Sequence, residues 1–192
     1  MQVNERPKPL ADNLDIRELI EQLYPCIHRA ALAITRNPCE ADDLAQETML
    51  QVLQSWSKFS GRSRASTWVY AILINIHRRQ LRGRNRFWRR LQDWFARRDT
   101  PPQACDPADT VEDSESRHDV WRLVARLPVT QRHVVVLRYG EELSYDDIAE
   151  VLECPLGTVK SRLHQALAAL KQMMESESSR TEARSVTPTV PR

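Results

Sequence analysis

The chain has 192 residues, enough for one ordinary domain or two small ones, with 41% hydrophobic and 28% charged residues and only 4 glycines. This composition favours a helical, well-solvated protein, and no apolar run approaches the roughly 20 residues that a membrane span needs. The N-terminus lacks the apolar core of a signal peptide and the 4 cysteines form no CxxC pair, so we expect free thiols in a reducing cytoplasm. Glycine-rich phosphate loops, nucleophile elbows and histidines at metal-ligand spacing are absent from the sequence. We therefore expect no enzyme, metal, cofactor or small-molecule substrate.

The net charge of +2 hides a strong segregation of charge along the chain. Residues 78–98 contain nine arginines and one aspartate, whereas residues 106–119 contain six acidic residues and one arginine. Such a basic block favours a polyanionic partner. The alternative is a solvated linker with charge blocks of no functional meaning.

The first two predicted helices are marked by apolar periodicity and by a cap. Apolar residues recur at helical spacing over residues 15–35, where Pro25 predicts a kink. The second helix is predicted to follow Asn37, which can act as its N-cap, with Pro38 at the first position and Glu40 closing a capping box. Its expected core residues are Ala41, Leu44, Ala45, Thr48, Val52 and Leu53.

The opposite side of the second helix is polar. Asp43, Gln46 and Glu47 are neighbours there at i, i+3 and i+4. They are either a surface for a partner or solvated helix residues.

A polar loop, SKFSGRSRAS, leads into the third predicted helix, TWVYAILINIHRRQLR. Trp68, Asn75 and Arg79 fall on a different side of it from the expected core residues, which are Val69, Ile72, Leu73 and Ile76. The following segment, residues 86–98, places aromatic residues on one side of a possible amphipathic helix and arginines largely opposite. It either extends the third helix and covers the first domain, or packs into a protein partner, or lies on a membrane surface.

Residues 99–115 are rich in proline and acidic residues, which predicts a flexible linker. Helical periodicity then resumes around Val124 and Leu127, and Ser144 with Asp147 is spaced as a helix cap. After Met174 the composition predicts a disordered tail. The predicted fold is all-α, with two small helical domains joined by the linker.

The stretch YDDIAEVLECPLGTVKSRLHQALAAL predicts two short helices separated by a break at residues 154–157. Pro155 cannot sit in a helix interior and Gly157 weakens one, so the chain is expected to turn there. Cationic residues at the start of the second helix indicate a helix-turn-helix that presents this helix to DNA. An ordinary helical hairpin with solvated cations is the alternative.

Two longer stretches carry a resemblance to a known family. DDLAQETMLQVLQSWSKFSGRSRASTWVYAILINIHRRQL resembles region 2, and LPVTQRHVVVLRYGEELSYDDIAEVLECPLGTVKSRLHQAL resembles region 4, of bacterial RNA polymerase sigma factors of the sigma-70 family, extracytoplasmic-function (ECF) class. The resemblance implies region 2 over residues 12–82, a linker over 83–115, region 4 over 116–172 and a tail over 175–192. It implies an alternative sigma factor in the cytoplasm that directs transcription initiation.

The resemblance also implies which surfaces bind which partners. In this family the polar face of the second helix docks on the β′ clamp of core RNA polymerase, so Asp43, Gln46 and Glu47 become candidate polymerase contacts, and the β flap is a further expected part of the partner. Candidate contacts with the single-stranded −10 promoter element are Phe59, Trp68, Asn75 and Arg79. Candidate contacts with the −35 duplex are Arg138, Thr158, Lys160, Ser161, Arg162, His164 and Gln165. An anti-sigma factor is a further candidate partner.

Some features leave alternatives open. Phe59 and Trp68 can equally be core aromatics. The loop residues 62–65 and Gln165 depart from residues common in relatives, so neither promoter sequence can be copied from them. Residues 83–115 could extend to about 110 Å, more than the roughly 70 Å between the two promoter elements. Rival interpretations are a helix-turn-helix regulator that binds operator DNA, and a nonspecific nucleic-acid-binding protein.

Overall fold

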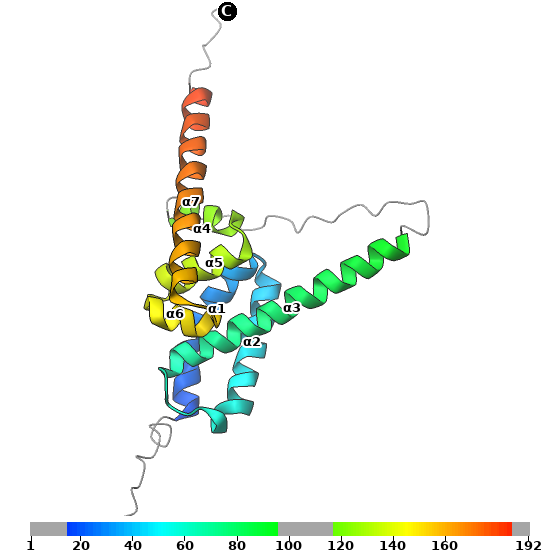
Figure 1. Cartoon of the computed structure of the whole chain (residues 1–192), viewed down its shortest axis with the longest axis vertical. Helices are drawn as coiled ribbons and strands as arrows, with labels where there is room; N and C mark the ends of the chain where they lie inside the picture. The colour runs from blue at the N-terminus through cyan, green and yellow to red at the C-terminus, as the bar shows by residue number, and fades with distance from the viewer. Residues whose placement is uncertain (1–14, 96–116, 186–192) are drawn as a thin grey trace, which may run out of the picture.

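The computed structural model describes residues 15–95 and 117–185, and within these ranges the chain contains helices and no strand. Figure 1 shows a bundle of helices from which the ends of two long helices project. The helices are α1 (Ile16–Thr35), α2 (Pro38–Ser55), the short η2 (Trp56–Lys58), α3 (Ala65–Phe95), α4 (Arg117–Arg126), α5 (Val129–Val135), the π-helical η3 (Val136–Gly140), α6 (Tyr145–Leu152) and α7 (Leu156–Ser185). None of the described helices is long and apolar enough to cross a membrane.

Helices α1 and α2 form an antiparallel pair whose ends are set by local signals. Pro25 lies inside an uninterrupted α1, which ends at Arg36 in the left-handed conformation. Asn37 caps α2 by accepting a hydrogen bond from the Glu40 N–H at 3.2 Å, as predicted. The predicted capping box is not formed, because the Glu40 carboxylate is paired with Arg84 of α3 instead.

The core side of α2 differs from the prediction at one position. Leu53 is 49% exposed, whereas Met49 is buried with the other five predicted residues. At 100° per residue, Met49 lies closer than Leu53 to the line formed by Ala41, Ala45 and Val52. The helix therefore turns Met49 toward α1 and α3 and leaves Leu53 in solvent.

Helix α3 is longer than the sequence predicted, and its two halves differ in environment. Val69, Leu73 and Ile76 of the inner half are buried as expected, while Ile72 is only partly buried. The outer half projects away from the bundle (Figure 1), with Phe87 61% exposed. The basic segment thus extends α3 but does not cover the first domain over its described residues. Because residues 83–95 are helical, they span about 20 Å rather than the ~45 Å of an extended chain, and the reach of the linker is shorter than predicted.

The second half of the chain forms the predicted helix-turn-helix with two corrections. Ser144 and Asp147 form a complete capping box at the start of α6. The turn after α6 is made by Glu153 in the left-handed conformation (φ 51°), while Gly157 already belongs to α7. Helix α7 continues to Ser185, so the prediction of a disordered tail is wrong for residues 175–185. Ion pairs of Glu175 with Lys171 and of Glu177 with Arg126 accompany this extension.

Among the described glycines of this half, Gly140 is the one at which a side chain would press against a neighbouring residue. A Cβ at this position would lie 3.3 Å from the Trp121 ring of α4. The π-helical turn η3 can therefore pass directly beneath that ring.

The two helical units that the sequence predicted are packed against each other. Helix α6 lies on α3, and α1 packs on α4, α5 and η3, so that buried residues of both units form one continuous core. The Arg132 side chain of α5 is buried and donates hydrogen bonds to the carbonyl oxygens of Ile34 in α1 and Leu127. It thereby satisfies a carbonyl at the C-terminal end of α1, where no helical partner exists.

Candidate nucleic-acid and protein interfaces

The predicted polymerase-binding face of α2 is present as a surface, but its three residues differ in their surroundings. Asp43 and Gln46 are exposed. Glu47 is half-buried and accepts hydrogen bonds from Arg79 and, at 2.9 Å, from Gln80 of α3. Asp43 and Gln46 are therefore oriented to solvent, whereas Glu47 also ties α2 to α3.

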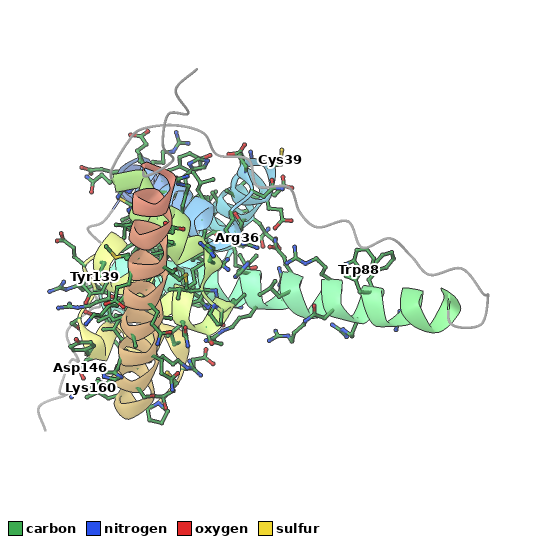
Figure 2. The ribbon with its side chains drawn as sticks, turned by 90° about the horizontal axis from the view of Figure 1, so that it is seen from above. Arg36, Cys39, Trp88, Tyr139, Asp146 and Lys160 are labelled. Atoms are coloured by element: carbon green, nitrogen blue, oxygen red, sulfur yellow. The ribbon has the colours of Figure 1, made fainter. Side chains whose placement is uncertain are left out.

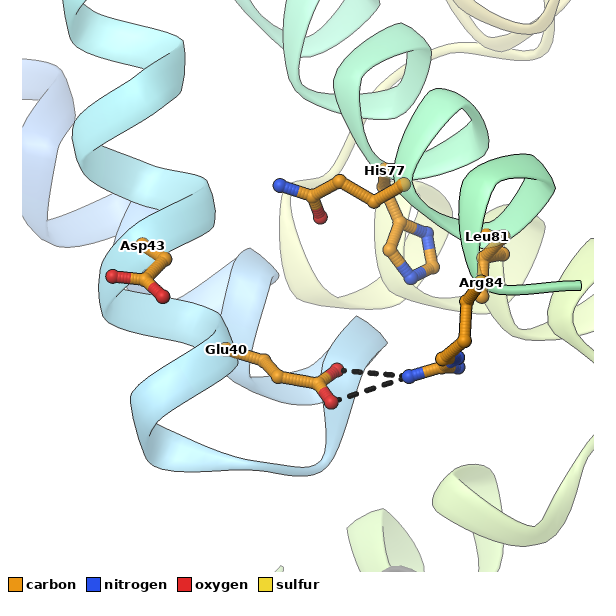
Figure 3. A pocket seen from close by; sticks show the side chains of 6 residues that line it. Glu40, Asp43, His77, Leu81 and Arg84 are labelled. Carbon is orange, nitrogen blue, oxygen red and sulfur yellow. Dashed lines mark hydrogen bonds and ion pairs between the residues drawn. The ribbon is translucent and has the colours of Figure 1, made fainter. Parts of the chain in front are cut away.

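An open cleft runs beside this face between α2 and α3, as Figure 3 shows. The Glu40 carboxylate accepts two hydrogen bonds from Arg84 across it, at 3.2 and 3.4 Å. Asp43 and His77 line the same cleft. No group of three metal-ligating side chains occurs among the described residues; Glu40 is paired with Arg84 here, and Asp43 adds a second carboxylate. The cleft is thus part of a protein surface rather than an enclosed ligand site.

Three aromatic rings form a cluster where the loop after α2 meets the start of α3. Phe59 stacks on Trp56 with ring centroids 5.2 Å apart, and Trp68 lies 5.2 Å from Phe59 and 6.0 Å from Trp56. All three are partly buried, so the rings pack on one another and keep part of their surface in solvent, which leaves both interpretations of Phe59 and Trp68 open. Stacked, partly exposed rings suit the capture of unstacked bases. Trp56 was not predicted to belong to this cluster, although its spacing of three from Phe59 across a turn was a usable signal.

The other two candidate −10 residues, Asn75 and Arg79, form polar contacts with other side chains of the protein. Asn75 is exposed and donates a hydrogen bond of 3.4 Å to the Glu153 carboxylate, which follows α6. Arg79 is paired with Glu47 of α2. Directly before Trp68 in the sequence, Thr67 donates to Asp147 at the start of α6, at 3.1 Å. Helix α6 therefore lies along the face of α3 that was predicted to bind the −10 strand.

The centre of the contact between the two units is a pair of buried histidines. His77 Nδ1 and His133 Nε2 are 3.0 Å apart, and the residues are only 4% and 2% exposed. Burial, with nearby Arg132 and Arg78 acting in the same direction, lowers the pKa of His77 to about 4 and the pKa of His133 to about 3. Both rings are therefore neutral at pH 7, and one donates a hydrogen bond to the other.

A second polar contact joins the units near the start of α3. The Tyr70 hydroxyl donates a hydrogen bond to the Glu141 carboxylate, whose side chain is 5% exposed and 3.9 Å from the guanidinium of Arg29. Burial raises the pKa of Glu141, and the hydrogen bond from Tyr70 opposes this shift. Neither this contact nor the histidine pair was predicted, since no local pattern marks the partners.

The start of α7 exposes most of the residues predicted to contact the −35 duplex. Four of the seven candidate −35 residues are exposed there: Lys160, Ser161, His164 and Gln165. Thr158 is partly buried in the first turn, where its carbonyl accepts a hydrogen bond from the Ser161 hydroxyl. The apolar side of the same helix packs through Val159, Leu163 and Ala166. The motif thus offers cations and an amide to a groove next to the positive end of a helix dipole.

The two arginines among the candidate −35 residues, Arg138 and Arg162, are partly buried rather than exposed. Arg138 donates a hydrogen bond of 2.8 Å to the Leu143 carbonyl, and its guanidinium lies 4.9 Å from the Tyr145 ring centroid. Arg162 is partly buried, with its guanidinium 4.0 Å from the sulfur of Cys154. Both side chains stabilise the motif, and neither belongs to the exposed group at the start of α7.

Comparison with known proteins gives a consistent picture. The family model for Sigma-70 region 2 matches residues 19–87, and that for Sigma-70, region 4, matches residues 117–170. The ECF RNA polymerase sigma factor EcfG of Rhodopseudomonas palustris is 30% identical over 168 residues, which cover 86% of this chain and 87% of the relative. ECF RNA polymerase sigma factor SigW of Bacillus subtilis is 27% identical over 176 residues, covering 85% and 88% of the two chains. The solved sigma factor RpoE from Bartonella quintana, in complex with the anti-sigma factor NepR, superposes with a TM-score of 0.67 at 25% identity, covering 84% of this chain and 97% of that one.

Proposed function

Because the chain belongs to the ECF class of the sigma-70 family of RNA polymerase sigma factors, we propose that it recognises promoters through a −35 duplex and a single-stranded −10 element while bound to core polymerase. The observation that carries this proposal is the exposed polar group at the start of α7, held on α6 by the turn at Glu153. A helix presented in this way can enter a major groove with Lys160 and Gln165 toward base edges and phosphates.

The −10 element is assigned to the loop after α2 and to α3. The cluster of Trp56, Phe59 and Trp68 offers stacking faces, and Asn75 and Arg79 offer an amide and a cation on the same helix. Stacking on aromatic side chains is worth about 1–3 kcal/mol per base, which favours the separated strand over the duplex. Because α6 lies on this face, binding both promoter elements requires the two units to separate.

Core polymerase is assigned to the α2 surface of Asp43, Gln46 and Glu47. A carboxylate and an amide that face solvent suit a basic partner surface through charge-assisted hydrogen bonds. The same proposal includes an anti-sigma factor as a partner, since the similar chain from Bartonella quintana is bound to one.

The polymerase assignment is tested with Asp43→Lys/Gln46→Lys, because neither side chain forms a hydrogen bond or ion pair with another described residue. Reversing this surface juxtaposes like charges against a basic partner, which costs several kcal/mol. We expect affinity for core polymerase to fall at least about a hundredfold, with promoter-directed transcription falling in parallel. Binding to labelled core polymerase and run-off transcription on a genomic promoter library measure these effects.

The matched control is Glu21→Lys/Gln22→Lys on α1, which changes the net charge by the same amount on exposed positions. Circular dichroism checks that both variants fold. A folded Asp43/Gln46 variant that binds and transcribes like the control would overturn the assignment of this surface.

A further inference from the structure

The two buried histidines lie where the first helical unit, α1 to α3, meets the second unit, α4 to α7. His77 comes from α3, and His133 comes from α5, 56 positions later in the sequence. The Nδ1 atom of His77 and the Nε2 atom of His133 are 3.0 Å apart, and both residues are buried. The hydrogen bond between the two rings therefore exists only while the two units are packed together.

This hydrogen bond depends on the number of protons that the two rings carry. A neutral imidazole has one nitrogen that donates and one that accepts, so one proton lies between the two facing nitrogens. A further proton on the accepting nitrogen would place two N–H groups opposite each other across 3.0 Å. Neither ring forms a second hydrogen bond with another described residue, so no other acceptor is in place for a charged ring.

The charges around the two rings also disfavour an imidazolium. Burial acts first and the neighbouring cations second, and both lower the pKa of the rings. The cations are guanidinium groups from four helices: Arg36 of α1, which acts through Arg132, Arg78 and Arg84 of α3, Arg132 of α5, and Arg162 of α7. A proton taken up by the packed pair would thus add a positive charge to an already cationic surrounding.

The nearby carboxylates do not compensate for these cations. Glu40 and Asp43 of α2 line the same cleft as His77, but Glu40 is paired with Arg84 and Asp43 is exposed to solvent. Glu153, which follows α6, accepts its hydrogen bond from another position on α3. Among the described residues, no carboxylate is ion-paired with either ring of the histidine pair.

We propose that His77 and His133 form an acid-sensitive switch: the two neutral rings hold the helical units together, and uptake of a further proton releases the second unit from the first. Release would uncover the side of α3 on which α6 lies, where Asn75 contacts Glu153 and Thr67 contacts Asp147. The separation of the units stands by itself. A gain in single-strand binding on the uncovered side rests on the proposed function.

The direction of the pH effect follows from the packed state. Because packing holds the pKa of each ring below its ordinary value of about 6.5, the packed form is fully favoured above that pH and weakens as the pH falls toward 4. At pH 5 the ratio of separated to packed molecules should be about thirtyfold higher for each ring than at neutral pH. Burial raises the pKa of Glu141, so this single carboxyl group opposes the two rings.

The switch is tested by energy transfer between dyes on the two units of the full chain. The donor is attached to the exposed Cys39 of α2 and the acceptor to Asp146→Cys on α6, with the other three native cysteines replaced by serine. In Figure 2 these two positions lie on opposite sides of the bundle. Urea titrations at pH 7.5 and pH 5 follow the transfer together with the helical circular dichroism. At pH 5 we expect the transfer to change at a lower urea concentration than the helical signal.

The pair itself is tested with His77→Asn/His133→Gln, which should remove the pH dependence of the transfer midpoint. The matched control is His28→Asn/His164→Asn, which removes one ring bonded within the first unit and one exposed ring, and it should behave as the wild type. If the amide variant kept the acid shift of the wild type, the proposal would be overturned. Coincident transfer and helical transitions at both pH values would also overturn it, because the units would then not separate on their own.

The functional consequence is measured separately, with a labelled ten-nucleotide strand and fluorescence anisotropy at the same two pH values. Apparent affinity is proportional to the fraction of binding-competent molecules, so we expect at least about a tenfold gain at pH 5 in the wild type and in the control. The amide variant should gain less than about threefold. Separation of the units without a gain in strand binding would leave the switch standing and remove the strand-binding role of α3. A gain without separation would overturn the switch.

Discussion

Residues 65–81 of α3 are covered by α2 on one side and by α6 on another, whereas residues 82–95 of the same helix project from the bundle. The two halves share one polar stripe, which begins with Asn75 and Arg79 and continues with Arg82, Arg86 and Arg90. In the inner half this stripe is occupied by the chain itself, through the contact of Asn75 with Glu153 and the pair of Arg79 with Glu47. In the outer half the equivalent positions are open.

The difference separates two roles that a single helix can have. The inner half is where the two units are held together: the contact of Asn75 with Glu153 is lost when the units part, whereas the pair of Arg79 with Glu47 lies within the first unit. The outer half projects from the bundle and is accessible in either arrangement.

The largest expected effect is on the free energy of unfolding, and only a substitution in the inner half of α3 should produce it. Leu73 is fully buried, so Leu73→Ala should lower the free energy of unfolding by about 2–5 kcal/mol through lost burial and a cavity. Trp88→Ala in the outer half removes a larger side chain, but from a 38% exposed position. This variant should change the free energy of unfolding by no more than about 0.5 kcal/mol. Urea unfolding of both variants measures this. Similar losses in the two variants would show that the outer half also packs on the bundle.

Lowering the pH should separate the two helical units that are held together along the inner half of α3. The pKa values of His77 and His133 are about 4 and about 3 with the units packed, and return toward about 6.5 when the units part. The packed form is thus fully favoured above pH 6.5 and loses stability as the pH falls below it. At pH 5 each histidine contributes about 2 kcal/mol toward separation. We expect the radius of gyration, measured by small-angle scattering, to increase between pH 7 and pH 5.

A variant without titratable rings provides the control for the acid effect. His77→Asn/His133→Gln places amides near the two bonded nitrogens, so a hydrogen bond can persist while protonation is removed. Burial raises the pKa of Glu141, which favours the packed form on acidification and so opposes the histidines. If the amide variant expands with acid as the wild type does, the histidines are not responsible.

Local sequence signals predicted much of the fold, and there is also a physical reason for each contact that they did not predict. The caps at Asn37 and Ser144 were predictable because each depends on residues within one turn. Exposure of Lys160 and Gln165 followed from helical periodicity. The contact between His77 and His133 could not be predicted, because the two residues are 56 positions apart and neither differs locally from a solvated histidine.

Candidate site residues with long side chains were the hardest to place. Arg138 was predicted to contact the −35 duplex, but its guanidinium turns back to the Leu143 carbonyl and the Tyr145 ring. Arg79 similarly bends toward Glu47. A flexible side chain can choose among several partners, and only the packed structure shows which partner lies within reach.

The smallest expected effect concerns the single hydrogen bond that covers Asn75. Glu153→Ala removes the acceptor at 3.4 Å and also a carboxylate that would repel phosphates. An exposed hydrogen bond of this kind contributes about 0.5–1 kcal/mol, so affinity for a short random single strand should rise about two- to fivefold. Fluorescence anisotropy with a labelled ten-nucleotide strand measures this in the full chain.

Glu150→Ala is the matched control, because Glu150 is exposed on α6 and its loss changes the net charge equally. Adding Asn75→Ala to the Glu153 variant should cancel the gain, since the amide is the group that becomes available. A gain of the same size from Glu150→Ala would show that general charge repulsion, rather than the uncovering of Asn75, limits strand binding. In that case the inner and outer halves of α3 would differ in packing but not in their access to DNA.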